Sequence, residues 1–105
     1  MTEMAGPGGT GPAVLDIGAG AGALVVYTAP ELRGREIEVS PDGRALRTHT
    51  AILERSMAGR RVHAAVFVEL APGRYTLWGA KAAQTRSVTI TAGKVTEVDW
   101  RPRAS

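Results

Sequence analysis

Turn-forming residues interrupt this chain at short, regular intervals, and no other property of the sequence limits its fold as strongly. The runs that they leave are short and have the spacing of strands in an all-β domain. The interruptions fall at 18–22, 30–34, 41–43, 58–59, 72–73, 79–84 and 92–93. We therefore expect an all-β fold, a single antiparallel β-sandwich of seven or eight strands.

The segment "RVHAAVFVEL" (61–70) has the clearest alternation of side chains. A period of two places alternate residues of a strand on opposite faces of the sheet. We expect one set to face the core, namely Val62, Ala64, Val66, Val68 and Leu70. The opposite set, facing outward, would be His63, Ala65, Phe67 and Glu69. "REIEVS" (35–40) alternates in the same way, with Ile37 and Val39 inward and the two glutamates outward.

Two turns predict how later strands are joined. Ala92-Gly93 lies between "SVTIT" and "KVTEVDW", which we expect to form a hairpin. Pro72-Gly73 fits the two central positions of a type II turn, because Pro fixes φ and Gly accepts the positive φ that follows.

The segment "RALRTHTAILERSMAG" (44–59) fits either a helix or a strand. Helical spacing relates Leu46, His49, Leu53 and Met57, with Asp42 as a possible N-cap and Gly59 as a stop. Two threonines disfavour a helix, and the positions from 46 to 52 alternate. We choose the strand interpretation, which makes this segment a hairpin partner of residues 60–70.

The length of 105 residues allows one domain with one modest core. Residues 1–12 contain four Gly and two Pro, a composition that buries too little apolar area to offset the entropy of ordering. We therefore expect a flexible tail at 1–12, a β-sandwich domain at 13–101 and a short tail at 102–105.

The stretch "VLDIGAGAG" (14–22) looks like the glycine-rich loop of S-adenosylmethionine methyltransferases, with Glu38 in the place of the ribose-binding carboxylate. Such a loop joins a buried parallel strand to a helix. Here "ALVVYTAP" follows, in which Val25, Val26 and Tyr27 favour a strand and Pro30 would stop a helix early. We expect a strand after the glycines and no bound cofactor.

Composition excludes several further classes of function. The chain has no cysteine, so disulfides and thiolate metal sites are absent. Its thirteen basic residues are interspersed with ten acidic ones, unlike the concentrated charge of nucleic-acid-binding proteins. No stretch reaches the ~20 apolar residues of a membrane span, and the first residues do not resemble a signal peptide. We expect a cytoplasmic protein that binds neither nucleic acid nor membrane.

Few residues offer catalytic or metal-binding chemistry. None of the serines lies in a Gly-x-Ser-x-Gly elbow. In the expected hairpin, His49 would pair near Val66 or Phe67, roughly 10 to 14 Å from His63, too far for both to bind one metal ion. Carboxylates do pair two residues apart, as Glu36 with Glu38 and Glu97 with Asp99. Such pairs fit the solvated face of a strand, so we expect no enzyme and no metal site.

The segments "AAVFVELAPGRYTLWG" and "SVTITAGKVTEVDW" together resemble the C-terminal half of prealbumin-like β-sandwich modules, such as carboxypeptidase regulatory-like and collagen-adhesin B-type repeats. The chain also resembles a group of small actinobacterial proteins through "GALVVYTAPELRGREIEVSP" and "RYTLWG". The resemblance implies an immunoglobulin-like sandwich with Tyr75 packed near its turn. The implied core residues are Val66, Val68, Leu77, Val88, Ile90 and Val98. The isopeptide-forming residues of adhesin repeats and the catalytic motifs of transthyretin-like hydrolases do not occur.

Two aromatic residues are the candidate binding residues, both on outward faces. Trp78 alternates with Tyr75 and Leu77, which leaves it either covered by a loop, the N-terminal segment or a second subunit, or free as a platform for a ligand or partner. Phe67 is the apolar outward position of 61–70. We expect a non-catalytic binding or protein-interaction module that self-associates or binds another protein. The alternative is a small enzyme or ligand-handling, carbohydrate-like domain that uses the paired carboxylates and Trp78.

Overall fold

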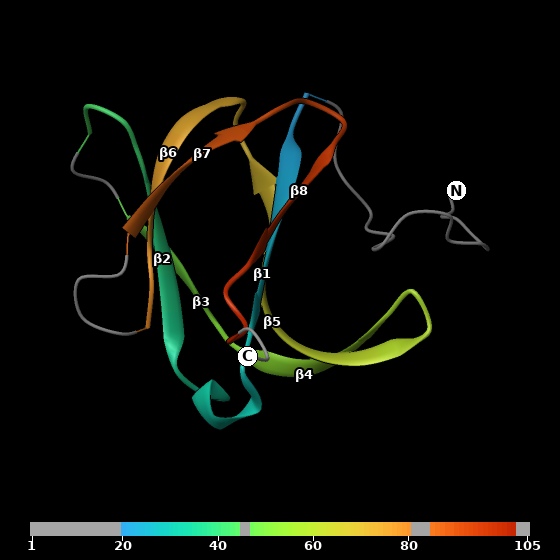
Figure 1. The fold of residues 1–105 in the computed structure, drawn as a ribbon. Helices are drawn as coiled ribbons and strands as arrows, with labels where there is room; N and C mark the ends of the chain where they lie inside the picture. Colours follow the sequence, from blue (N-terminus) through green and yellow to red (C-terminus); the bar gives the residue numbers. More distant parts are fainter. Residues whose placement is uncertain (1–19, 45–46, 81–84, 103–105) are drawn as a thin grey trace.

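The structure, a computed structural model, describes residues 20–44, 47–80 and 85–102, and these form a sandwich of two four-stranded sheets (Figure 1). Sheet A has the order β4-β5-β1-β8 and sheet B the order β3-β2-β6-β7. The eight strands are β1 (Gly22–Thr28), β2 (Glu36–Pro41), β3 (Thr48–Ala51), β4 (Leu53–Met57), β5 (Arg60–Leu70), β6 (Gly73–Trp78), β7 (Thr85–Ile90) and β8 (Val95–Asp99). The all-β prediction and the upper strand count are confirmed, and the predicted tail at 1–12 lies outside the described residues.

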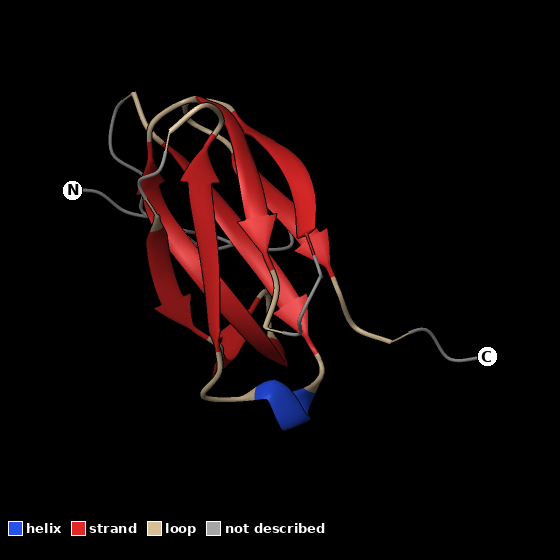
Figure 2. Cartoon of the chain, turned by 90° about the vertical axis from the view of Figure 1, so that its left-hand side faces the viewer, coloured by secondary structure: helices blue, strands red, loops and turns tan. Residues whose placement is uncertain are grey.

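A single turn of 3-10 helix, η1 (Pro30–Leu32), joins β1 to β2 at one end of the sandwich (Figure 2). Pro30 begins this turn, in agreement with its expected role as the end of the preceding strand. The ambiguous segment at 44–59 contributes β3 and β4 within its described residues, so the strand interpretation is confirmed.

Strand β1 lies inside sheet A and is buried along its whole length. It pairs with β5 in the antiparallel sense and with β8 in the parallel sense. The sandwich therefore includes a parallel pair of strands, whereas the sequence predicted antiparallel pairing. Leu24 and Val26 face sheet B, whereas Val25 and Tyr27 face the opposite side. A strand with apolar residues on both faces is the usual pattern for one that is covered on both sides.

The last glycine of "VLDIGAGAG" has a packing role. Gly22 is the first residue of β1, so a strand follows the glycines, as expected. A Cβ at this position would lie 2.5 Å from the Thr91 carbonyl oxygen and 2.6 Å from Cγ2 of Ile90. Only a residue without a side chain allows β1 to pass this close to the end of β7.

The chain changes sheets at three links that the sequence suggested were hairpins or continuous strands. Ile52 separates β3 in sheet B from β4 in sheet A. The expected β7–β8 hairpin is wrong, because β7 lies in sheet B and β8 pairs with β1. The Pro72-Gly73 link also joins the two sheets, and Gly73 has a φ of 144° where a type II turn needs about 80°.

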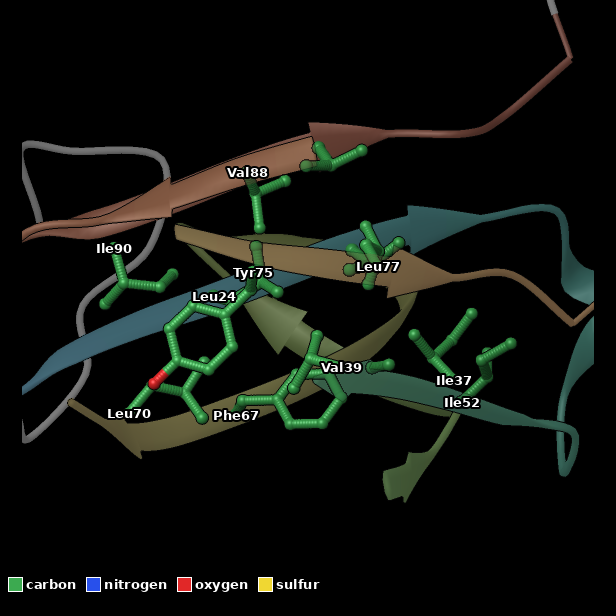
Figure 3. Close-up of a cluster of buried hydrophobic side chains, with 13 residues drawn as sticks. Leu24, Ile37, Val39, Ile52, Phe67, Leu70, Tyr75, Leu77, Val88 and Ile90 are labelled. Atoms are coloured by element: carbon green, nitrogen blue, oxygen red, sulfur yellow. The ribbon is translucent and has the colours of Figure 1, made fainter. Parts of the chain in front are cut away.

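The main core lies between the two sheets (Figure 3). Its buried members are Leu24, Val26, Ile37, Val39, Ile52, Ala65, Phe67, Leu70, Tyr75, Leu77, Val88, Ile90 and Val98. The Tyr75 hydroxyl donates a hydrogen bond of 2.7 Å to the Ala71 carbonyl, which ties the β5–β6 link to the start of β6. The expected core positions on β6, β7 and β8 are thereby confirmed.

The expected faces of β5 are wrong for most of its length. Leu24 pairs with Phe67 and Val26 with Ala65, and directly opposed residues share a face, so Phe67 and Ala65 point into the core. Val66 and the exposed Val68 do not belong to this core. A bulge then shifts the register between Phe67 and Leu70, which returns Leu70 to the core.

We expect Gly22→Ala to lower the free energy of unfolding by about 1–3 kcal/mol, because the added methyl group overlaps a backbone carbonyl. The matched control is Gly20→Asn. Gly20 has a φ of 79° with no atom within 4 Å of the place where a Cβ would lie, and Asn tolerates this region, so its cost should stay below about 1 kcal/mol. Urea unfolding measures both values, and equal costs would contradict the close-packing role of Gly22.

Candidate binding surface

The outer face of sheet A, which points away from sheet B, carries a second apolar cluster. Its buried members are Val25, Tyr27, Met57 and Ala64, and its partly buried members are Val62, Val66 and Val95. The register explains this grouping, because Val25 lies opposite Val66 and Tyr27 lies opposite Ala64. We call this group the outer cluster.

Two exposed apolar side chains extend the outer cluster. Leu53 on β4 lies opposite Ala64 and therefore shares its face, and Leu53 is 47% exposed. Val68 follows Val66 by two residues at the bulge of β5 and is 46% exposed. Among the described residues, these are the large hydrophobic side chains that remain exposed. Exposed apolar groups beside an apolar cluster are typical of interaction surfaces.

The β4–β5 hairpin forms one side of a cleft on this face. The hairpin extends on the side of sheet A away from sheet B (Figure 1), and its turn consists of Ala58 and Gly59 with φ of 50° and 79°. Positive φ at both central positions is the type I′ geometry of two-residue hairpins. The cleft has a volume of about 330 Å³ and is lined by Tyr27, Met57, Ala58, Arg60, Val62, Glu97, Asp99 and Arg101.

Polar contacts order the β8 side of the cleft. The Tyr27 hydroxyl donates a hydrogen bond to Oε2 of Glu97. Burial, this hydrogen bond and the negative charge of Glu97 raise the pKa of Tyr27 to about 12. Arg101 binds Asp99 through Nε at 2.9 Å and a terminal nitrogen at 2.7 Å, and its guanidinium lies 5.2 Å from the centre of the Tyr27 ring. Tyr27 is thus a protonated hydrogen-bond donor at neutral pH.

The lining residues limit the chemistry of the cleft. They include no serine, threonine, histidine or lysine, the side chains that most often act as nucleophiles or general bases besides carboxylates. The carboxylates Glu97 and Asp99 both contact other lining residues. The lining therefore combines charged groups with the apolar side chains of Met57 and Val62.

The outer face of sheet B holds Trp78 in a polar setting. Its indole nitrogen donates a hydrogen bond of 3.2 Å to the Ser40 hydroxyl. The Arg47 guanidinium lies 4.1 Å from the ring centre and forms an ion pair of 2.7 Å with Glu38. Trp78 lies on the outward face, as predicted, but it is half-buried because Arg47 covers it.

Several other candidate residues lie apart from one another. Phe67 is 4% exposed in the main core, so its expected outward position is wrong. His49 pairs with Glu38 on β2 in sheet B, whereas His63 is on β5 in sheet A, so the expected pairing of His49 with β5 is also wrong. Glu36 contacts His49 at 3.3 Å. The two carboxylate pairs therefore occupy opposite sheets and do not form one site.

Comparison of the chain with protein-family models, curated proteins and solved structures finds no match. The helical residues in the described part of the chain form no segment long and apolar enough to cross a membrane. In that same part, no three histidine or acidic side chains cluster as a metal ion would require. The surface must therefore be interpreted from its own geometry.

The sequence analysis did not predict the outer cluster, although one segment of the sequence indicates it. "GALVVYT" has no charged residue and no polar alternation, and a strand of this kind is normally covered on both faces. The apolar residues at alternate positions of β5, from Val62 to Val66, then belong on the outer face of sheet A rather than in the main core.

We expect Tyr27 to titrate near pH 12. In a Tyr75→Phe background, Tyr27 is the sole tyrosine, and the phenolate absorbance follows its titration. The folded-state pKa of Tyr27, about 12, exceeds the unfolded value of about 10. The protonated Tyr27 hydroxyl therefore stabilises the folded state fully below about pH 10, and this contribution is lost as pH rises through about 12. Glu97→Gln should lower the midpoint, and a wild-type midpoint near 10 would contradict the buried contact.

We expect Arg47→Ala to increase the quenching of Trp78 fluorescence by acrylamide, because the guanidinium shields one face of the ring. The measurement uses a Trp100→Phe background, which leaves Trp78 as the sole tryptophan. Arg44→Ala is the matched control, since Arg44 is a nearby exposed arginine. Equal quenching in the two variants would show that Arg47 does not cover the ring.

Proposed function

We propose that this domain is a non-catalytic protein-interaction module that binds its partner on the outer face of sheet A. The observation that supports this proposal most directly is the exposure of Leu53 and Val68 beside the outer cluster. Exposing a large apolar side chain to water is unfavourable, and a partner that covers Leu53, Val68 and the outer cluster removes this cost.

The extent of the surface favours a protein partner over a small molecule. Apolar residues cross all four strands of sheet A, from Leu53 on β4 to Val95 on β8. The cleft of about 330 Å³ occupies one end of this face and is near the lower limit of roughly 300–1,000 Å³ for small-ligand sites. A partner that lies on the whole face would also cover the cleft.

The charge distribution supports a protein partner over nucleic acid. Many arginines in the described part of the chain lie beside carboxylates, as in Arg61–Glu54 at 2.9 Å and Arg74–Asp42 at 3.7 Å. A nucleic-acid surface instead gathers uncompensated positive charge on one face. A cytoplasmic module that binds another protein fits this surface.

The second candidate is a small ligand-handling domain, and the cleft is the observation that favours it. Glu97 and Asp99 lie beside the apolar residues Met57 and Val62, a combination suited to a small molecule with a positive charge. The carbohydrate-like version of this alternative requires a free Trp78 ring, and Arg47 would have to move before a sugar could stack on it.

A photo-crosslinking amino acid placed on each face tests the proposed function in the native cell. Probes at Leu53 and Val68 should give protein adducts, whereas probes at Ser87 and Thr89 on sheet B should not. Leu53→Ser and Val68→Ser should change the unfolding free energy by only about 0.5 kcal/mol, because both side chains are exposed. Adducts from the sheet B positions alone would contradict the proposal.

A further inference from the structure

Two of the four charged side chains that line the cleft have no partner of opposite charge in the described part of the chain. Arg101 pairs with Asp99 at 2.7 Å, so these two charges compensate each other. Glu97 accepts its hydrogen bond from the uncharged Tyr27 hydroxyl. Neither Glu97 nor Arg60 takes part in an ion pair there. The cleft therefore presents one uncompensated negative charge and one uncompensated positive charge.

The strand register keeps these two charges apart. Glu97 on β8 is level with Val25 on β1, which is level with Val66 on β5. Arg60 lies six residues further along β5, at the turn of the hairpin. Six residues of a straight strand cover about 20 Å. Glu97 and Arg60 therefore lie at opposite ends of the cleft and do not neutralise each other.

Apolar side chains lie between the two charged ends. Tyr27 is two residues beyond Val25 on β1, and Val62 is two residues beyond the level of Tyr27 on β5. Met57 lies opposite Arg60 on the other strand of the hairpin. Tyr27, Val62 and Met57 all belong to the outer cluster, and the hairpin extends beside them (Figure 1). The cleft thus has an acidic end, an apolar middle and a basic end.

We propose that the cleft binds an elongated zwitterion, a molecule with an ammonium group at one end, a carboxylate at the other and an alkyl chain between them. Tyr27 donates to Oε2 of Glu97, which leaves Oε1 to accept a hydrogen bond from the ammonium group. The carboxylate pairs with the guanidinium of Arg60. The alkyl chain covers the apolar middle of the cleft.

The size and the charge of the cleft both restrict the ligand. A volume of about 330 Å³ holds roughly eleven non-hydrogen atoms at the ~30 Å³ of a water molecule each. A dication would bring a positive charge to Arg60, and a dianion would bring a negative charge to Glu97. A zwitterion of the size of 8-aminooctanoate satisfies both ends.

This inference goes beyond the proposed function and does not depend on it. The proposed function depends on Leu53 and Val68, and neither residue lines the cleft. The purified chain is sufficient for the test, because no protein partner takes part.

Titration of the full chain, followed by the NMR shifts of its backbone amides, compares three ligands of equal chain length. These are 8-aminooctanoate, octanoate, which lacks the ammonium group, and octylamine, which lacks the carboxylate. The amides of Tyr27 and Val62 should shift on binding. The dissociation constant of 8-aminooctanoate should be at least about fivefold lower than that of either other ligand, because only the zwitterion pairs with both ends. The shorter 4-aminobutanoate should lose this advantage, since it cannot reach both charges.

Two conservative variants assign the ends of the ligand. Glu97→Gln should abolish the preference for 8-aminooctanoate over octanoate and retain the preference over octylamine. Arg60→Gln should have the opposite effect, and general unfolding cannot produce this crossed pattern. The matched controls, Glu31→Gln in η1 and Arg86→Gln in β7, change exposed residues outside the cleft and should leave both preferences intact. Thermal unfolding of each variant checks that it remains folded.

Three outcomes would overturn the zwitterion proposal. One is equal affinity for the three ligands, and another is the absence of shifts in the cleft at millimolar 8-aminooctanoate. The third is a preference over octylamine that is lost in Arg101→Gln and kept in Arg60→Gln. Adducts from Leu53 without zwitterion binding would leave the proposed function intact and remove this inference. Zwitterion binding without such adducts would do the reverse.

Discussion

The burial of β1 on both faces is the constraint on which the rest of this structure depends. Leu24 and Val26 hold sheet A against sheet B, while Val25 and Tyr27 hold the outer cluster together. Each apolar side chain buried in this way stabilises the fold by about 1.5–3 kcal/mol. A two-layer sandwich normally needs only one apolar face per sheet, and the second face of sheet A creates the candidate binding surface.

The alternation of short runs was sufficient to predict the fold class. In "REIEVS", Glu36 and Glu38 alternate with Ile37 and Val39, so its inward face is unambiguous, and both apolar residues are buried in the core. Tyr75 and Leu77 on β6 and Val88 and Ile90 on β7 were identified correctly for the same reason. Where polar and apolar residues alternate, the pattern distinguishes the two faces of a strand.

Alternation did not identify the inward face of β5, because both faces of this strand are apolar near its centre. Ala64 and Val66 cover the outside of sheet A, whereas Ala65 and Phe67 fill the core, so the alternation carries little contrast. The bulge before Leu70 adds a change of register that no residue type in the sequence predicts. The outward position of Trp78 was predictable from alternation. The contact of Arg47 with the Trp78 ring was not, because it depends on the pairing of β2 with β6 and on the path of the chain from β2 to Arg47. The cleft likewise depends on the path of the β4–β5 hairpin, which periodicity does not describe.

The parallel pairing of β1 with β8 has a consequence for synthesis of the chain. These are the first and last strands in the described sequence, so a growing chain exposes one hydrogen-bonding edge of β1 until β8 has left the ribosome. All four strands of sheet B precede β8, and β5 is also available earlier. The nascent domain therefore passes through a stage in which a strand with two apolar faces has an open edge, the kind of edge that other chains can join. Because β1 and β8 are so distant in sequence, their pairing also favours slow folding, which prolongs this stage.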